Sequence, residues 1–389
     1  DELGSLVLKP VSGLSCAAEE LLRLLRRPIS RLACVGGLLL RGSLTAWIVT
    51  GIVLLIPLPD LRGFDWTPSD EEIQKYRQSW NPLSNGPVMI PGVDIQPKGQ
   101  WLLHPYLFNQ ISERQFGNDL RFASGRERSS SGHLYSLQPL IGMAYGLTDH
   151  IEVGASTTLS AFCTRNSDRA NAGAGGRVFT NTGMGDTSVA FKYRPIIQDP
   201  DGWRPSLTFW NQLVLPTSQW ITGTEKPPGG FAPLGRLPAA RFGSLTWTEG
   251  AMLRKILQPF RFNAAVFYSY HFPGQQGNES TYPSDIINTR LVMEHFLNDD
   301  YGFAYNLEFV GLHGLPWRAD GHAINRGFAH GFNIIGIEPV IQFKLGRESH
   351  WVGAVGALFT IAGQNALDGI YPNFSIYYYW SETGKVIMR

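Results

Sequence analysis

The sequence has few charged residues and no excess of either sign. Only 17% of its 389 residues are charged, and 33 Lys and Arg against 32 Asp and Glu leave a formal net charge of +1. A typical globular domain contains about 25% charged residues. No basic field is present to attract nucleic acid, and no acidic tail is present either. We therefore expect no nucleic-acid partner.

Cysteine is also scarce. The three cysteines, Cys16, Cys34 and Cys163, match the spacing of no zinc site, haem attachment site or disulfide framework. We therefore expect no metal and no other cofactor. Glycine (43 residues) and aromatic residues (12%) are by contrast abundant. This composition favours strands and loops over helices.

One long uncharged run stands near the start of the chain. Residues 42–59 carry no charge and follow a basic stretch at 19–41. A basic segment before an apolar run is typical of an export signal, but the run also approaches the roughly 17–25 residues that span a bilayer. We expect residues 1–66 to be an export leader with an apolar helix. An uncleaved inner-membrane anchor and a buried helix are the alternatives.

Residues 67–99 join this leader to the rest of the chain. Ser69 and Glu72 have the spacing of a helix capping box, which predicts a short polar helix that ends near Trp80. The stretch that follows contains four prolines and is predicted to be irregular. It is interpreted either as a periplasmic linker or as a plug that packs into a barrel lumen.

From about residue 100 onward, segments of about a dozen residues alternate between apolar and polar side chains. This period of two is typical of strands that bury one face. Twelve such segments are predicted, at 100–112, 134–146, 149–162, 185–196, 204–215, 244–257, 260–272, 285–297, 301–312, 332–345, 349–361 and 369–380.

The connections between these strands alternate in length. Turns of a few residues, as at Leu147–Thr148 and Gln258–Pro259, alternate with long loops such as 163–184 and 216–243, although the last loop, 362–368, is shorter. Outer-membrane barrels have short periplasmic turns, longer external loops and an even number of strands. Because backbone groups within a bilayer must all be paired, such a sheet has to close on itself.

The sequence therefore predicts an all-β fold. We expect a transmembrane antiparallel up-and-down β-barrel of about 12 strands over residues 100–380, with a helical leader before it and a short tail, 381–389, after it. One strand illustrates the two faces. Its apolar residues Val189, Phe191 and Tyr193 are predicted to face lipid. Its charged residues Asp186, Lys192 and Arg194 are predicted to face the lumen.

On this alternation, a set of charged side chains faces the lumen. They are interpreted either as a constriction that selects solutes or as an internal network of ion pairs that fills a narrow barrel. Side chains fill barrels of about 8 strands and a channel runs through those of about 16, so both possibilities are open for 12. The candidate lumen residues are Glu152, Asp186, Lys192, Arg194, Arg290, Glu294, Glu308, Glu338 and Lys344.

Three short motifs resemble the outer-membrane barrels of the meta-pathway phenol-degradation channel family. They are the Tyr-Gly-Leu-Thr-Asp turn at 145–149, the Gly-x-Gly-Asp at 183–186 and the Lys-Tyr-Arg at 192–194. The resemblance covers about 100–380. It implies a porin-like channel in the outer membrane of a Gram-negative bacterium, associated with aromatic degradation.

The predicted function is passive diffusion of small, hydrophobic or aromatic solutes through the outer membrane. The expected partners are membrane lipid and these solutes; the sequence leaves the oligomeric state open. No enzyme is expected, because the single local candidate for a catalytic serine, at 131–133, has no group to orient it. A structural or adhesive barrel without solute flux is the alternative.

Overall fold

The computed structural model describes most of the chain after residue 90. All described residues lie in the second of two compact units, Asp65–Arg389, and the predicted leader and residues 382–389 of the predicted tail lie outside the described residues. No helix within the described residues is long and apolar enough to cross a membrane. The described residues are 71, 91–117, 119–123, 132–166, 177–199, 203–217, 244–276, 279–282, 285–298, 302–316, 318–319, 322–323, 331–345 and 350–381.

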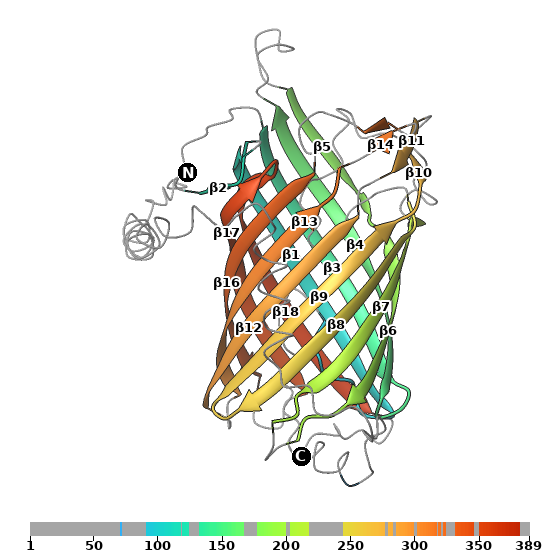
Figure 1. Cartoon of the computed structure of the whole chain (residues 1–389), viewed down its shortest axis with the longest axis vertical. Helices are drawn as coiled ribbons and strands as arrows, with labels where there is room; N and C mark the ends of the chain where they lie inside the picture. The colour runs from blue at the N-terminus through green and yellow to red at the C-terminus, as the bar shows by residue number, and fades with distance from the viewer. Residues whose placement is uncertain are drawn as a thin grey trace, which may run out of the picture. The chain divides into compact units, whose positions relative to one another are not determined.

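Within these residues, twelve strands form one antiparallel sheet that closes into a barrel (Figure 1). Each strand pairs with its neighbours in the sequence, and the first pairs with the last, with Trp101 opposite Trp380. The twelve are β1 (Gln100–Gln115), β3 (Gly132–Gly146), β4 (Ile151–Asn166), β6 (Thr187–Ile196), β7 (Ser206–Leu215), β8 (Thr246–Leu257), β9 (Phe260–His271), β12 (Ile286–Asn298), β13 (Phe303–Gly314), β16 (Phe332–Lys344), β17 (Trp351–Gln364) and β18 (Leu367–Ser381).

The predicted count of twelve strands is confirmed, and each predicted segment overlaps one of these strands. Their lengths of 10–16 residues match or exceed the roughly 9–11 residues that a tilted strand needs to cross a bilayer. The lower end of the barrel in Figure 1, where β3 turns into β4 and β8 into β9, is here called the turn end, and the upper end is called the loop end.

The loop end contains more strand than the sequence predicted. The predicted loop 163–184 is partly wrong, because β4 continues to Asn166 and pairs there with β5 (Arg177–Met184). The predicted loop 362–368 is wrong, because β17 and β18 are joined through Asn365 and Ala366 alone. Asn365 has a φ of 48°, a left-handed conformation that asparagine tolerates better than most residues.

Further short strands form at the loop end. One, β2 (Arg121–Phe122), pairs with β17. Four others, β10 (Gly274–Gln276), β11 (Glu279–Tyr282), β14 (Arg318–Ala319) and β15 (His322–Ala323), form a small second sheet among the described residues.

The side chains of the barrel are distributed inside out relative to a water-soluble protein. In β6, Val189 and Phe191 are 45% and 40% exposed on the outer face, whereas Lys192 and Arg194 are 7% and 2% exposed on the inner face. The outer faces of β13 and β16 likewise carry large apolar residues, such as Phe309 and Ile341. A barrel with apolar residues outside and polar residues inside is the arrangement expected in lipid.

Five prolines lie within the described barrel strands, where a missing N–H removes a ladder hydrogen bond, and Pro139, Pro339 and Pro372 are three of them. Pro139 pairs with Leu107 of β1, but the ladder to β4 has no pairs at residues 138–139. Pro339 and Pro372 are placed in the same way, each paired on one side and facing a two-residue gap on the other. Each of these three prolines therefore lies where one ladder is already interrupted.

Aromatic side chains form a continuous band on the outer face at the turn end. The ring of Trp101 lies 4.5 Å from that of Tyr145 and 5.9 Å from that of Trp380. Tyr378 extends the band, 5.5 Å from Trp380 and 4.3 Å from Trp351. Rings of this kind favour the interface between lipid and water, because one end is apolar and the other forms hydrogen bonds.

Candidate functional site

Residues 91–99, which precede β1, lie against the inner faces of the barrel strands; we call them the inner segment. Val93, Asp94, Ile95 and Gln96 are each no more than 2% exposed. The segment turns into β1 through Gly99, whose N–H donates to the carbonyl of Gly146 at 2.9 Å and whose φ of 81° favours glycine.

Three consecutive strands of the sheet hold the backbone of the inner segment. The hydroxyl of Thr208 in β7 donates to the carbonyl of Val93 at 2.6 Å. The ammonium of Lys192 in β6 donates to the carbonyl of Asp94 at 3.1 Å. The backbone N–H of Gln96 donates to Glu152 of β4 at 2.8 Å. Backbone groups that would otherwise be buried unsatisfied therefore have partners on the barrel wall.

Two buried guanidinium groups meet the carboxylate of Asp94. Arg254 of β8 forms an ion pair with it, and Arg194 of β6 lies 3.6 Å away. Next to them, Lys192 and Glu152 are directly opposite each other on adjacent strands, with Nζ and Oε1 2.9 Å apart. Buried charges are tolerated when they are paired and hydrogen-bonded. The inner segment thus contributes a carboxylate that the basic side chains of the wall require.

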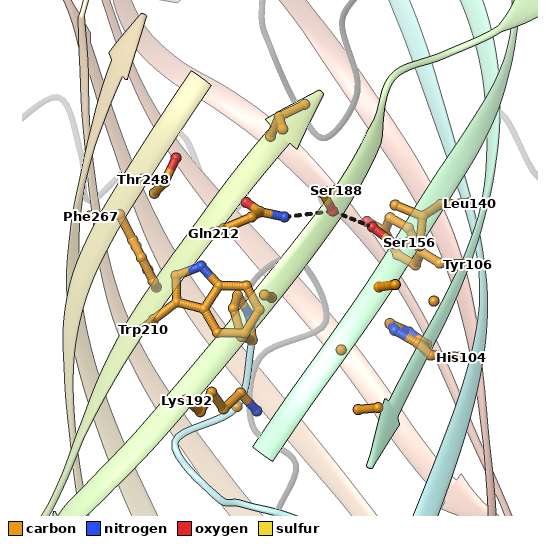
Figure 2. A pocket seen from close by; sticks show the side chains of 18 of the residues that line it. His104, Tyr106, Leu140, Ser156, Ser188, Lys192, Trp210, Gln212, Thr248 and Phe267 are labelled. Carbon is orange, nitrogen blue, oxygen red and sulfur yellow. Dashed lines mark hydrogen bonds between the residues drawn. The ribbon is translucent and has the colours of Figure 1, made fainter. Parts of the chain in front are cut away.

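A cavity of about 370 Å³ lies in the barrel beside the inner segment, partly open to the outside (Figure 2). Asp94 and Gln96 form part of its lining, together with Glu152 and Lys192. The cavity extends along β8, β9 and β12 to residues at the loop end of these strands, including Thr246, His271 and Ile286. It is therefore bounded by the inner segment on one side and reaches toward the loop end.

Hydroxyl and amide groups line one wall of this cavity. Figure 2 shows Ser188 between Ser156 and Gln212, with hydroxyl oxygens 2.7 Å apart and the amide of Gln212 donating to Ser188 at 2.9 Å. Thr248 and Ser269 form a similar pair, 2.8 Å apart, on β8 and β9. This wall offers donors and acceptors but no net charge.

Aromatic side chains also line the cavity, from β1, β7, β9 and β18. Trp210 and Phe267 project from β7 and β9 (Figure 2), and the ammonium of Lys192 lies 5.7 Å from the ring centroid of Trp210. His104 of β1 stacks on Tyr377 of β18 with ring centroids 4.2 Å apart. Pockets of this size with apolar walls and a few polar groups are typical of sites for small molecules.

A second group of charges lies in the walls of β9, β12, β13 and β16. Glu294 accepts hydrogen bonds from Arg261 at 3.0 Å and from Asn263 at 2.9 Å. Glu308 and Glu338, both fully buried, stand directly opposite each other, and Arg290 interacts electrostatically with both. This group forms a network of buried charges distinct from the one around Asp94.

Seven of the nine predicted lumen residues fall into these two groups, and Asp186 and Lys344 do not. Glu152, Lys192 and Arg194 surround the inner segment, and Asp186 is buried in the lining of the cavity. The remaining candidates, Arg290, Glu294, Glu308 and Glu338, belong to the second group. Lys344, at the turn end of β16, is half-buried and belongs to neither group.

Sequence reasoning missed three of the charges that organise these groups. Arg261 alternates with the outward-facing Phe260 and Phe262, so the rule used for the other strands applies to it. Arg254 is harder to assign, because Lys255 follows it directly. Asp94 lies in the irregular stretch before β1, where alternation gives no signal.

A cluster of buried apolar side chains fills part of the barrel interior next to the cavity, and sequence reasoning also missed it. Tyr106, Phe108, Ile334, Leu358 and Tyr371 belong to one buried cluster built from β1, β16, β17 and β18. A strand such as β17 is apolar on both faces, so alternation does not reveal its inward-facing residues. This cluster borders the cavity, since Tyr106 belongs to the cluster and also lines the cavity.

Comparison with known proteins supports the fold. No protein-family model and no curated protein matches the sequence. A crystal structure of the COG4313 outer membrane channel from Pseudomonas putida F1 covers 74% of this chain and 98% of its own, with 13% identity and a TM-score of 0.55. This chain therefore has the barrel architecture of that channel, and at this identity the similarity concerns the fold alone.

Weaker similarities were found to two other barrels. The transport unit of the autotransporter AIDA-I from Escherichia coli covers 80% of this chain and 99% of its own, with 11% identity and a TM-score of 0.42. A mutant of the TodX monoaromatic hydrocarbon channel covers 73% and 90%, with 11% identity and a TM-score of 0.36.

Proposed function

We propose that this chain is an outer-membrane channel for passive diffusion of small hydrophobic or aromatic solutes, closed at rest by the inner segment. The observation that carries the proposal is the cavity of about 370 Å³, which is lined by the barrel wall and bounded on one side by the inner segment. The apolar outer face and the aromatic band support a location in the membrane. The resemblance of 145–149 and 183–194 to the phenol-degradation channel family supports aromatic solutes.

The cavity lining suits solutes that combine an apolar body with one polar group. Trp210, Phe267 and Tyr106 supply apolar surface, and Ser188 and Gln212 supply hydrogen-bonding groups. The apolar body of such a solute would pack against the aromatic side chains, and its polar group would form hydrogen bonds with Ser188 or Gln212. For lumen passage, the inner segment has to move, because it borders the cavity on the side away from the loop end.

The Gly146→Ala substitution tests whether the inner segment closes the pore. A methyl group on Gly146 would overlap the backbone carbonyl oxygens of Gln96 and Pro97, which belong to the inner segment. Gly142, on the same strand, has room for a methyl group, since its nearest neighbours would be 3.7 Å away. Gly142→Ala is therefore the matched control.

The measurement is the single-channel conductance of the refolded full chain in planar bilayers. We expect rare steps from the wild-type protein and from Gly142→Ala, and frequent, defined steps from Gly146→Ala. In the conducting variant, replacing Lys192 by Met removes a cation from the lumen lining and should shift ion selectivity toward cations. Unchanged selectivity would contradict the proposed lumen position of Lys192.

A structural or adhesive barrel is the alternative, and the buried charge networks and the buried apolar cluster favour a filled interior. If Gly146→Ala folds and inserts but gives no conductance steps, the channel proposal is wrong and this alternative is favoured.

A further inference from the structure

The inner segment is held by a carboxylate, and this suggests what could displace it. We propose that the Asp94 carboxylate occupies a recognition site for organic carboxylates, formed by Arg254, Arg194 and Lys192. A small solute that bears a carboxylate and an apolar body would compete with Asp94 for this site and release the inner segment. This inference deepens the proposed function and depends on it for its consequence, the opening of the pore.

The first argument is the arrangement of donors around Asp94. Arg254 forms an ion pair with its carboxylate, Arg194 lies 3.6 Å from it, and Lys192 donates to its carbonyl at 3.1 Å. Arg254 and Arg194 are 1% and 2% exposed. Planar guanidinium groups match carboxylates in shape and charge, and the low exposure strengthens their hydrogen bonds.

The second argument is the position of these groups relative to the cavity. Asp94 and Lys192 line the cavity, whereas neither Arg194 nor Arg254 is part of its lining. The guanidinium groups therefore lie behind Asp94 as seen from the cavity. A solute carboxylate that enters the cavity meets Lys192 first, and it reaches the arginines only by replacing the Asp94 side chain.

The third argument is the fit of the solute body. The cavity has a volume of about 370 Å³, and Trp210 lies next to Lys192 at 5.7 Å. An apolar cavity of about 150 Å³ is large enough for benzene, so a single ring with one carboxylate fits here. Benzoate is a suitable probe because its ring can lie along Trp210 and Phe267 while its carboxylate points toward Lys192.

The balance of charge explains why displacement is feasible. A solute carboxylate that replaces Asp94 brings the same charge to the same guanidinium groups, so no buried cation is left without an anion. An uncharged solute of the same size has no such effect, since it cannot replace the carboxylate. The site should therefore distinguish benzoate from benzyl alcohol.

The test is calorimetric titration of benzoate and benzyl alcohol into the refolded full chain at low chloride concentration. In Asp94→Asn the internal competitor loses its charge, and we expect benzoate to bind about tenfold more tightly than to the wild-type chain. Arg254→Gln should lose benzoate binding. Benzyl alcohol should bind all variants alike. Arg121→Gln, which changes an exposed arginine beside Asp119 at the loop end, is the control for charge alone.

An equal or weaker affinity of Asp94→Asn for benzoate would overturn the inference, as would equal gains for benzoate and benzyl alcohol. Arg254→Lys keeps the charge and serves if Arg254→Gln does not fold; it should bind benzoate more weakly than the wild-type chain. Conductance separates the two proposals. If Gly146→Ala conducts and the benzoate affinity is the same with and without the Asp94 carboxylate, only this inference fails. If the benzoate affinity changes in Asp94→Asn and no variant conducts, the channel proposal fails.

Discussion

Replacing Glu294 by Ala tests whether the second charge group is a dry structural network. Glu294 is fully buried and accepts hydrogen bonds from Arg261 at 3.0 Å and Asn263 at 2.9 Å. Removing one partner of a buried ion pair costs about 3–5 kcal/mol, because the other charge stays buried without its partner. We expect Glu294→Ala to lower the free energy of unfolding by this amount.

The assay is equilibrium unfolding by urea in lipid vesicles, followed by tryptophan fluorescence. A pure loss of stability moves the midpoint and leaves the slope unchanged. Glu249→Ala is a matched control, since this exposed carboxylate accepts a hydrogen bond from Trp247 at 3.0 Å. Removing this carboxylate leaves no buried cation without its partner, so the control should lose clearly less stability than Glu294→Ala.

A double variant separates the charge from the packing. Replacing Glu294 by Leu and Arg261 by Met removes both charges while keeping similar volume, and such replacements are often neutral or stabilising. We therefore expect the double variant to be more stable than Glu294→Ala. If Glu294→Ala itself costs less than about 1 kcal/mol, water screens this pair, and the reasoning that makes the network structural is refuted.

Two further predictions concern the aromatic band and the cavity wall. Trp380→Ala removes ring contacts to Trp101 and Tyr378 and should lower the free energy of unfolding in vesicles by about 1–3 kcal/mol, at roughly 0.5–1.5 kcal/mol per ring pair. Trp380→Phe should lose less stability. An equal loss would contradict a role for the larger ring. Trp210→Ala should increase the single-channel conductance of Gly146→Ala, because it widens the cavity; unchanged conductance would mean that the pore does not pass Trp210.

The alternation of side chains was enough to predict the barrel, because each strand has one apolar outer face. In β13, Phe303, Tyr305 and Phe309 are exposed, and Asn306 and Glu308 are buried. A one-residue shift would have exchanged these two sets, so the pattern determines the orientation of each strand. The same rule failed at the loop end, where strand pairing beyond residue 162 continues without a lipid-facing pattern.

The partners of the inward-facing residues could not be predicted in this way. Lys192 and Asp94 are 98 positions apart, and Thr208 and Val93 are 115 apart. Their contacts depend on the closing of the barrel, which sets the inner faces of β4, β6 and β7 around one segment. Alternation therefore predicts that a charged side chain faces the lumen, but it does not predict which residue that side chain contacts.

The position of Asp94 shows what this difference means for function. In the sequence, Lys192 and Arg194 suggest a constriction with a positive charge. In the structure, the inner segment adds a carboxylate to these cations, and Arg254 joins them from β8. A wall that carries the cations and a separate segment that carries the anion can exchange one anion for another without burying an unpaired charge. Charges fixed within the wall, such as Glu294 and Arg261, cannot do so. Asp94, the carboxylate that we propose a solute can displace, therefore lies in the inner segment, where the sequence shows no regular alternation.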